Sequence, residues 1–335
     1  MTTRESTIED IAARACVSKS TVSRVLNDSA TVSRDKKAAV LEAMTALGYQ
    51  PNVFARTLAG GRSMTVGIVT QYIGSPFYDG IAQGAIEGLG GTGVTPIFVD
   101  GRWEQGTEQE VIRTLLGRKV DGMLLIGGDV PVAELNSLKE RLPTVVAARR
   151  LPGWDNQCIS IDNVAAGYRA THYLVRHGHR QIVCIRGNKD HQDAIDRYRG
   201  YVKALEEAGL PINRKLVCQG DFTGQAGMMA VNSLVARGVH FSAIVAASDA
   251  VAFGARLALH RHGYRVPDDV SLIGFDDQEE AAWMTPPLTT MRQPAREIGA
   301  AAARALLSLI AGKDPPEPPQ MSAELQVRET VARHG

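Results

Sequence analysis

The sequence feature that most constrains the fold is an alternation that begins at Thr65 and continues to Phe275. Short runs rich in Val, Ile and other apolar residues alternate with amphipathic stretches such as 109–118 and 198–209. The runs typical of strands are 65–71, 94–100, 120–127, 143–148, 158–162, 181–185, 215–219, 243–247 and 270–275. Because strands that alternate with helices form parallel sheets covered by helices, this region predicts an α/β fold.

Nine strands in one run are more than a single sheet of ordinary size contains. Two α/β subdomains of similar topology, side by side, account for them. Ligands of open parallel sheets bind beyond the carboxyl ends of the strands, so we expect a cleft at those ends.

Polar and aromatic side chains follow several of these strands. They are Phe77, Tyr78, Asp193, Asp196, Arg197, Phe222, Ser248, Asp249, Asp276 and Asp277. Asp and Arg offer paired hydrogen bonds to hydroxyl groups, and aromatic faces pack against the C–H surface of a sugar. Each residue alone is more typical of a helix cap or a surface ion pair. Together they favour a site for a small carbohydrate-like ligand.

The first 62 residues differ from the rest in charge. They hold nine Lys or Arg and six Asp or Glu, a net of 9 − 6 = +3, whereas the remainder holds 28 and 30, a net of −2. A small basic module joined to a neutral-to-acidic body favours an anionic partner for the module alone.

The basic module predicts three short helices. The first is opened by Ser6 or Thr7, with Asp10 completing a capping box. The second spans 19–26 behind a Ser18 cap, and the third runs from a Ser33 cap through Leu47. Apolar positions that share one face are Ile8, Ile11, Ala12 and Ala15, then Val22, Val25 and Leu26, then Val40, Leu41, Met44 and Leu47.

Two helices joined by a short turn, with a third closing the core, form a helix-turn-helix. Its second helix enters the major groove of DNA by its N-terminal end, where Lys19, Ser20 and Arg24 lie here. Arg is the side chain that most often reads guanine. The alternative is a structural helical cap whose polar face is simply solvated.

The segment 52–59 is too short to persist as a helix alone in water. Its apolar residues Val53, Ala55 and Leu58 exceed what the small first module can bury. This pattern suggests a segment that folds only on DNA, with Leu58 as a wedge into the minor groove. The alternative is an ordinary linker between domains.

Two blocks of sequence carry a specific resemblance. "TIEDIAARACVSKSTVSRVLNDSATVS" and "LGYQPNVFARTLAGGRSMTVGIV" resemble the headpiece and hinge of the LacI/GalR family of bacterial repressors. The likeness continues through "DRYRGY", "SLIGFDD" and "PPLTTMRQP", so it covers nearly the whole chain. "VAARRLPGWDNQCISIDN" is similar to the galactose-repressor branch.

The resemblance implies that Lys19, Ser20 and Arg24 read bases, that Tyr49 and Asn52 help to fix the hinge, and that Leu58 is the minor-groove lever. The predicted DNA-binding set is Thr7, Ser18, Lys19, Ser20, Thr21, Ser23, Arg24, Asn27, Tyr49, Asn52, Ala55 and Leu58. One departure is Cys16, which replaces the glycine usual in the turn. A left-handed backbone there costs a non-glycine residue about 1 kcal/mol.

The resemblance also implies a body like a periplasmic sugar-binding protein, with an effector in its cleft. The predicted effector-binding set is Phe77, Tyr78, Arg149, Asp193, Arg197, Phe222, Ser248, Asp276 and Gln293. Family members frequently carry Asn at the position of Ser248 and Asp or Asn at that of Ala148. Ala148 removes a hydroxyl partner and adds room, so we expect a disaccharide or glycoside. Asp162 and Asn163, at a chain crossing, are equally typical of structural roles.

Several classes of protein are excluded by the sequence or have no support in it. The cysteines Cys16, Cys158, Cys184 and Cys218 lie far apart without a CxxC pair, which predicts free thiols and neither disulfides nor zinc. No metal, cofactor or catalytic residue is predicted. The N-terminus lacks the apolar core of a signal peptide and no run is long enough to span a membrane, so we expect a cytoplasmic protein without a membrane partner.

These patterns predict a helix-turn-helix headpiece over 1–50, a hinge helix and linker over 51–62, and an effector-binding and dimerisation domain over 63–335. We expect its subdomains to comprise 63–162 with 293–322, and 163–292 with 323–335. The chain stops soon after "LQVRETVARHG" without a heptad tail, which favours a dimer over a tetramer.

The predicted function is that of a homodimeric repressor on a palindromic operator, released by a small carbohydrate. Three alternatives stay open. A purine or other non-sugar co-repressor would suit the same Asp, Arg and aromatic residues. A glycoside-processing enzyme would leave the first 62 residues unexplained, and a transport binding protein would need a signal peptide.

Overall fold

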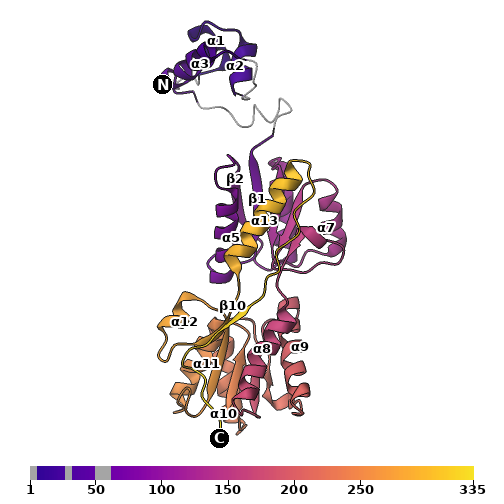
Figure 1. Ribbon diagram of the computed structural model, residues 1–335, viewed down its shortest axis with the longest axis vertical. Coiled ribbons are helices and arrows are strands. Elements are labelled where there is room, and N and C mark those ends of the chain that lie inside the picture. The colour runs from indigo at the N-terminus through magenta and orange to yellow at the C-terminus, as the bar shows by residue number, and fades with distance from the viewer. Residues whose placement is uncertain (1–5, 27–31, 50–61) are drawn as a thin grey trace. The chain divides into compact units, whose positions relative to one another are not determined.

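The computed structural model describes residues 6–26, 32–49 and 62–335. The chain divides into two compact units, Met1–Ser63 and Met64–Gly335 (Figure 1). In the described part of the first unit the helices are α1 (Ile8–Arg14), α2 (Lys19–Leu26) and α3 (Arg34–Ala46). Their buried side chains form one core, made of Ile11, Ala12, Val22, Val25, Val40 and Ala43. The predicted all-α first module is confirmed.

Helix α1 begins and ends as its sequence predicts. The Thr7 hydroxyl accepts a hydrogen bond from the Asp10 N–H while the Asp10 carboxylate accepts from the Thr7 N–H, which is a capping box. At the other end, the N–H groups of Cys16 and Val17 donate to the carbonyls of Ala13 and Ala12. This pattern is a Schellman motif, which requires a left-handed residue directly after the C-cap, and the C-cap here is Ala15.

Cys16 is that residue, with φ of 51°. A Cβ in the left-handed region is crowded against its own backbone, and glycine avoids this cost. The turn between α1 and α2 therefore has a geometry that suits glycine, with a residue that is less suited to it.

We predict that Cys16→Gly stabilises the first unit by about 0.5–1 kcal/mol, since relief of the left-handed strain outweighs the extra freedom of the unfolded glycine. Native-state hydrogen exchange of the α1 and α2 amides in the full chain measures this. Cys16→Ala keeps the Cβ and is the matched control, expected to change little. Equal exchange in the two variants would contradict the prediction.

The first sheet of the second unit contains β1 (Thr65–Thr70), β2 (Thr95–Asp100), β3 (Gly122–Ile126), β4 (Thr144–Ala147) and β5 (Cys158–Ile159). Its order is β2-β1-β3-β4-β5, with all pairs parallel. Side chains alternate between two apolar clusters. Ile68, Leu124 and Ile126 face α5 (Pro76–Leu89) and α13 (Ala295–Ile310), and Val69 and Leu125 face α6 (Gln105–Gly117) and α7 (Val132–Lys139).

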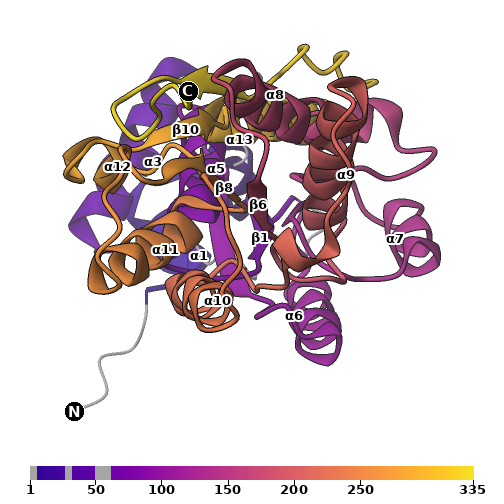
Figure 2. The ribbon, with the colours of Figure 1, turned by 90° about the horizontal axis from the view of Figure 1, so that it is seen from below.

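The second sheet contains β6 (Ile182–Ile185), β7 (Val217–Cys218), β8 (Ala243–Ala246), β9 (Ser271–Asp276), β10 (Thr289–Arg292) and β11 (Glu324–Gln326). Helices α8 (Asn163–Arg176) and α9 (Gln192–Glu207) cover one face, and α10 (Gly224–Ala236) and α11 (Asp249–Arg261) cover the other (Figure 2). The short helix α12 (Glu279–Trp283) follows β9. Burial on both faces explains why these strands are nearly continuous apolar runs.

The structure corrects the strand prediction at two places. Strands β10 and β11 lie in segments that the sequence did not mark as strands, and β11 pairs antiparallel with β10. The second sheet, in the order β11-β10-β9-β8-β6-β7, is therefore not wholly parallel. Every strand predicted from the sequence has a counterpart among the described residues.

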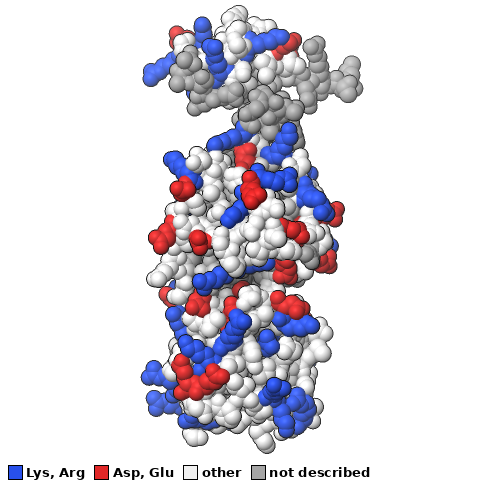
Figure 3. All heavy atoms as spheres, turned by 90° about the vertical axis from the view of Figure 1, so that its right-hand side faces the viewer, with Lys and Arg blue, Asp and Glu red and all other residues white. Residues whose placement is uncertain are grey.

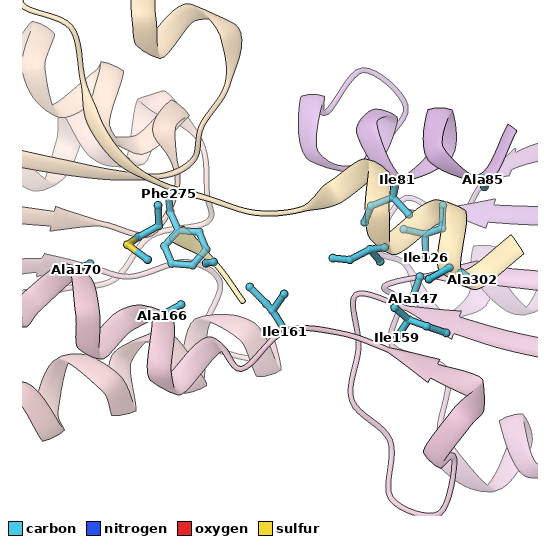
Figure 4. Close-up of a cluster of buried hydrophobic side chains, with 14 of the residues drawn as sticks. Ile81, Ala85, Ile126, Ala147, Ile159, Ile161, Ala166, Ala170, Phe275 and Ala302 are labelled. Atoms are coloured by element: carbon cyan, nitrogen blue, oxygen red, sulfur yellow. The ribbon is translucent and has the colours of Figure 1, made fainter. Parts of the chain in front are cut away.

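The chain passes between the two sheets at 160–162, 293–294 and 311–323. One apolar cluster reaches from one half to the other (Figure 4). Ile161 lies on the first crossing, between Ile81, Ile126 and Ile159 of one half and Phe275 and Ala166 of the other.

In the described chain, no helix is long and apolar enough to span a membrane.

Candidate functional site

Helix α2 presents a polar face opposite its buried side chains. Val22 and Val25 are buried in the core of the first unit, whereas Lys19, Ser23 and Arg24 are exposed. Ser20 is also exposed, at the N-terminal end of the helix. This end carries the side chains expected to meet base edges in the major groove.

Hydroxyl groups organise the start of α2. The Ser18 oxygen accepts from the Thr21 N–H at 3.2 Å and lies 2.8 Å from the Ser20 hydroxyl and 2.9 Å from that of Thr21. The Lys19 ammonium pairs with the Glu9 carboxylate of α1. Because both partners are exposed, the pair contributes little free energy and can exchange for a contact with DNA.

The remaining predicted DNA-binding residues divide into two groups. The Thr7 hydroxyl takes part in the capping box, and Tyr49 packs against the core of the first unit. Asn27, Asn52, Ala55 and Leu58, together with the predicted hinge helix, lie outside the described residues.

The second unit carries a cleft between its halves, at the carboxyl ends of both sheets. A cavity of about 300 Å³ lies there, lined by residues that follow β2, β3, β4 and β6. Figure 3 shows the second unit narrowing between its two halves, with Lys, Arg, Asp and Glu side chains interspersed. The cleft therefore lies where ligands of open α/β sheets bind.

Arg197 of α9 is a partly buried cation at the carboxyl ends of β8 and β9. Its Nε donates to Asn163 Oδ1 at 2.9 Å and its Nη1 donates to the Ala247 carbonyl at 2.6 Å. The guanidinium lies over the Phe275 ring, 3.6 Å from its centre. These contacts hold one edge of the guanidinium, and its charge acts on the Asp193 and Asp276 carboxylates.

Burial governs the ionisation of these carboxylates. It raises the pKa of Asp193 to about 6, against the opposing effect of Arg197. Burial also raises the pKa of Asp276, although Arg197 and a 2.7 Å hydrogen bond from Gln293 Nε2 oppose it. The pKa of Tyr78 is raised by burial and then by Asp193, which shows that these groups share one environment. Groups with perturbed pKa values in a cleft are typical of functional sites.

Aromatic rings connect the two halves across the cleft. The ring centres of Phe77 and Tyr78 lie 5.3 Å apart, and those of Tyr78 and Trp103 lie 5.9 Å apart. The His191 ring lies 3.6 Å from Trp103 and 5.6 Å from Phe222. Apolar ring faces therefore alternate with the charged groups, which is the combination that sugars require.

Two predicted effector residues have structural partners. The buried Ser248 hydroxyl donates to the Phe222 carbonyl at 3.0 Å and accepts from the Val251 N–H at 3.2 Å, which caps α11. Phe77 packs against the apolar cluster that joins the halves. Neighbouring Asp249, which the sequence also marked as a cleft candidate, is fully buried and accepts from the Thr290 hydroxyl and the Gln278 N–H.

The loop after β4 has an unusual backbone. Ala148 has φ of 54°, a region in which Asn and Asp are far better tolerated than Ala. Ala148 and Arg149 both line the cavity, and Arg149 Nη1 donates to the Val130 carbonyl at 2.9 Å. The backbone at position 148 therefore suits Asn or Asp, but the residue is Ala, whose small methyl side chain leaves space in the cavity.

The sequence analysis missed Trp103, Asp129, Asp190 and His191, which also line the cavity. Trp103 and Asp129 each lie three residues after a strand, β2 and β3 respectively. Residues that follow parallel strands meet at one edge, and this rule, applied to β2 and β3 as well, finds both. Among the described residues, no group of His, Cys, Asp and Glu is arranged to hold a metal ion.

We predict a pH-dependent stability difference between the wild type and Asp193→Asn. A raised carboxyl pKa favours the protonated folded state, so its contribution to stability is present below pH 4 and is lost as the pH rises through about 6. Between pH 7 and pH 4, the free energy of unfolding of the wild type should therefore rise relative to the variant by roughly 1–3 kcal/mol.

Urea unfolding of both proteins at several pH values measures this difference. A difference that stays constant across the range would show that Asp193 has an ordinary pKa.

A helix-turn-helix unit joined to a two-sheet unit with a polar and aromatic cleft is the architecture of a DNA-binding transcriptional regulator. Two family models match the chain. One describes bacterial regulatory proteins of the lacI family and matches residues 7–52, and the other describes a periplasmic binding protein-like domain and matches residues 171–331.

Two relatives align along almost their whole length. The transcriptional regulator GalR of Escherichia coli (strain K12) is 35% identical over 312 residues, which covers 93% of this chain and 91% of GalR. The transcriptional regulator CelR of Thermobifida fusca is 37% identical over 339 residues, which covers 98% of each. The chain belongs to the LacI family of bacterial transcriptional regulators.

Solved structures agree with this assignment. The lac repressor dimer bound to operator and the anti-inducer ONPF superposes with a TM-score of 0.89 at 25% identity, covering 98% of this chain and 100% of that chain. A CelR–cellobiose complex superposes with a TM-score of 0.74 at 34% identity, covering 97% and 100%. The predicted fold class and family are confirmed.

Proposed function

We propose that this regulator is a homodimeric repressor that binds a near-palindromic operator and is released by a disaccharide or glycoside. The convergence of Arg197, Asp193 and Asp276 with aromatic rings carries the effector half of the proposal. Arg and carboxylate groups can each bond two adjacent hydroxyls, and the rings cover the apolar face of a sugar. The cellobiose bound by CelR supports a disaccharide.

The dimer is supported by exposed apolar side chains. Ile86 of α5, Leu257 of α11 and Trp283 of α12 are exposed, Trp283 by 77%. Tyr72 and Ile73, which precede α5, are also exposed. Helices α5, α11 and α12 lie on the same side of the second unit in Figures 1 and 2. Large apolar side chains exposed on helices of one side support an interface there, and a second copy of the chain would provide the second half-site of a palindrome.

Light scattering tests the dimer directly. A mass of two chains supports the proposal, whereas a stable monomer or tetramer contradicts it.

Operator binding and effector binding are coupled, so that the ligand changes the affinity for DNA by a factor of about 5–150. The hinge residues Asn52, Ala55 and Leu58 belong to this proposal, with Leu58 as the minor-groove lever. A regulator that acts on the chromosome works in the cytoplasm.

A purine co-repressor is the second candidate, because the planar Arg197 and the rings of Phe222 and Tyr78 also suit a purine. No catalytic residue is proposed. Turnover of a chromogenic glycoside by the purified protein would favour the enzyme alternative over the regulator.

We predict that Arg24→Ala weakens operator binding by about 1–3 kcal/mol and relaxes sequence preference at one base pair, because it removes a side chain that reads a base edge. Fluorescence anisotropy with the palindrome nearest the gene and its single-base variants measures both effects.

Arg14→Ala is the matched control. It removes an exposed cation from α1 and should leave the sequence preference unchanged. An equal loss of affinity on every base variant in Arg24→Ala would assign Arg24 to the phosphate backbone instead.

We predict that Ala148→Asn raises the affinity for monosaccharides about fivefold to tenfold, because it supplies a hydroxyl partner worth about 1 kcal/mol. Asn tolerates the left-handed backbone of this position, so the thermal midpoint should not fall.

Isothermal titration with glucose and galactose measures the affinities. Ala148→Gly relaxes the backbone without adding a polar group and should leave them unchanged. An identical effect of Asn and Gly would rule out the hydrogen-bonding explanation.

A further inference from the structure

Trp103 reaches into the cleft from the loop after β2. It is half-buried, and its ring lies 5.9 Å from Tyr78 of its own half and 3.6 Å from His191 of the other half. Burial, with Arg197 and Arg149 nearby, lowers the pKa of His191 to about 4, so this ring is neutral at neutral pH. A large side chain that lines a cavity and contacts both halves is placed to contact a ligand bound there.

The backbone conformation that directs the Trp103 side chain is energetically unfavourable. Arg102 and Trp103 both have φ of 55°, and two successive non-glycine residues in the left-handed region cost on the order of 1–2 kcal/mol each. Such strain persists only where the surroundings hold it, and it gathers at functional sites.

A buried polar network holds the Trp103 loop. Gln71, fully buried, accepts from the Trp103 N–H at 3.3 Å and donates to the Glu108 carboxylate at 3.0 Å. The other Glu108 oxygen accepts from the Asp129 N–H at 2.9 Å, which ties the loop after β2 to the loop after β3. Trp103 therefore rests on a fixed support.

Glycine beneath the indole completes this support. A Cβ added at Gly127 would lie 3.2 Å from Trp103 Cη2. The indole thus lies close against the backbone after β3, with its position set on that side by the protein and not by a ligand.

The cavity beside Trp103 adjoins the group around Arg197 and shares Asp193 with it. Its lining also includes Ala148, Arg149, Asp190 and His191, but not Arg197, Asp276 or Gln293. Its volume of about 300 Å³ falls at the lower end for small-molecule sites, enough for one further ring of a ligand. The cleft therefore offers a polar subsite and, next to it, a subsite with an aromatic wall.

We propose that Trp103 is a specificity-determining residue: it supports the second ring of a disaccharide or the aglycone of a glycoside whose first ring is held by Arg197 and Asp276. The His191 ring contacts Trp103 at an interplanar angle of 64°, so a sugar ring that packs on the indole would have to displace it. This inference rests on the proposed carbohydrate effector and assigns the selection of size to one side chain.

Isothermal titration tests the assignment on the full chain with cellobiose, lactose, maltose, glucose and galactose. Trp103→Ala should weaken binding of the tightest disaccharide at least about tenfold and change monosaccharide affinity less than twofold. Trp103→Phe keeps an aromatic wall and should stay within about threefold of the wild type.

Tryptophan fluorescence gives a readout that a structural role would not move. The disaccharide should change the emission of the wild type, and Trp103→Phe should lose that change while titration heats still report binding. Unchanged disaccharide affinity in Trp103→Ala, or an equal loss for monosaccharides, overturns this assignment alone. A wild type that binds no saccharide overturns both it and the proposed carbohydrate effector.

Discussion

The Arg197 guanidinium is the contact on which the cleft depends. It bonds Asn163 at the start of α8 and the carbonyl that follows β8, and it lies on the ring of Phe275 in β9. Arg197 is partly buried, and a cation withdrawn from water is stabilised by hydrogen-bond acceptors and by nearby carboxylates. Two of its N–H groups donate to Asn163 and to the Ala247 carbonyl, and its charge acts on Asp193 and Asp276. The positive charge of Arg197 also lowers the cost of ionising Asp193 and Asp276. Ionised carboxylates accept hydrogen bonds, so these two can accept from the hydroxyl groups of a ligand.

The two halves of the second unit face each other through two kinds of side chain. Apolar side chains join them near Ile161, whereas rings and charged groups face each other in the cleft. A ligand that binds both faces of the cleft changes the balance between the halves. In the proposed function, that change is the means by which an effector bound to the second unit would alter DNA binding by the first.

The sequence predicted the helix-turn-helix and the parallel sheets because their apolar patterns are long and regular. It missed β10 and β11 because neither is a continuous apolar run: β10 is Thr-Thr-Met-Arg and β11 is Glu-Leu-Gln, with Glu324 exposed at a sheet edge. In the cleft, Arg197, Asp193 and Asp276 could be predicted from their places after strands. The double role of Ser248 could not, because a hydroxyl that caps a helix and one that binds a ligand occupy the same position in sequence. Trp103 also follows a strand, so its place could be predicted, but its direction depends on two left-handed residues that no local pattern marks.

The most direct test of the account is operator fluorescence anisotropy at fixed salt, since affinity for DNA depends steeply on salt. The full chain is titrated onto the palindrome nearest its gene, and a panel of disaccharides, glycosides and monosaccharides is then added. The account predicts tight binding that one disaccharide or glycoside reverses. Tight binding that no saccharide changes would contradict the carbohydrate effector and favour the purine alternative, and absence of specific binding would contradict the repressor itself.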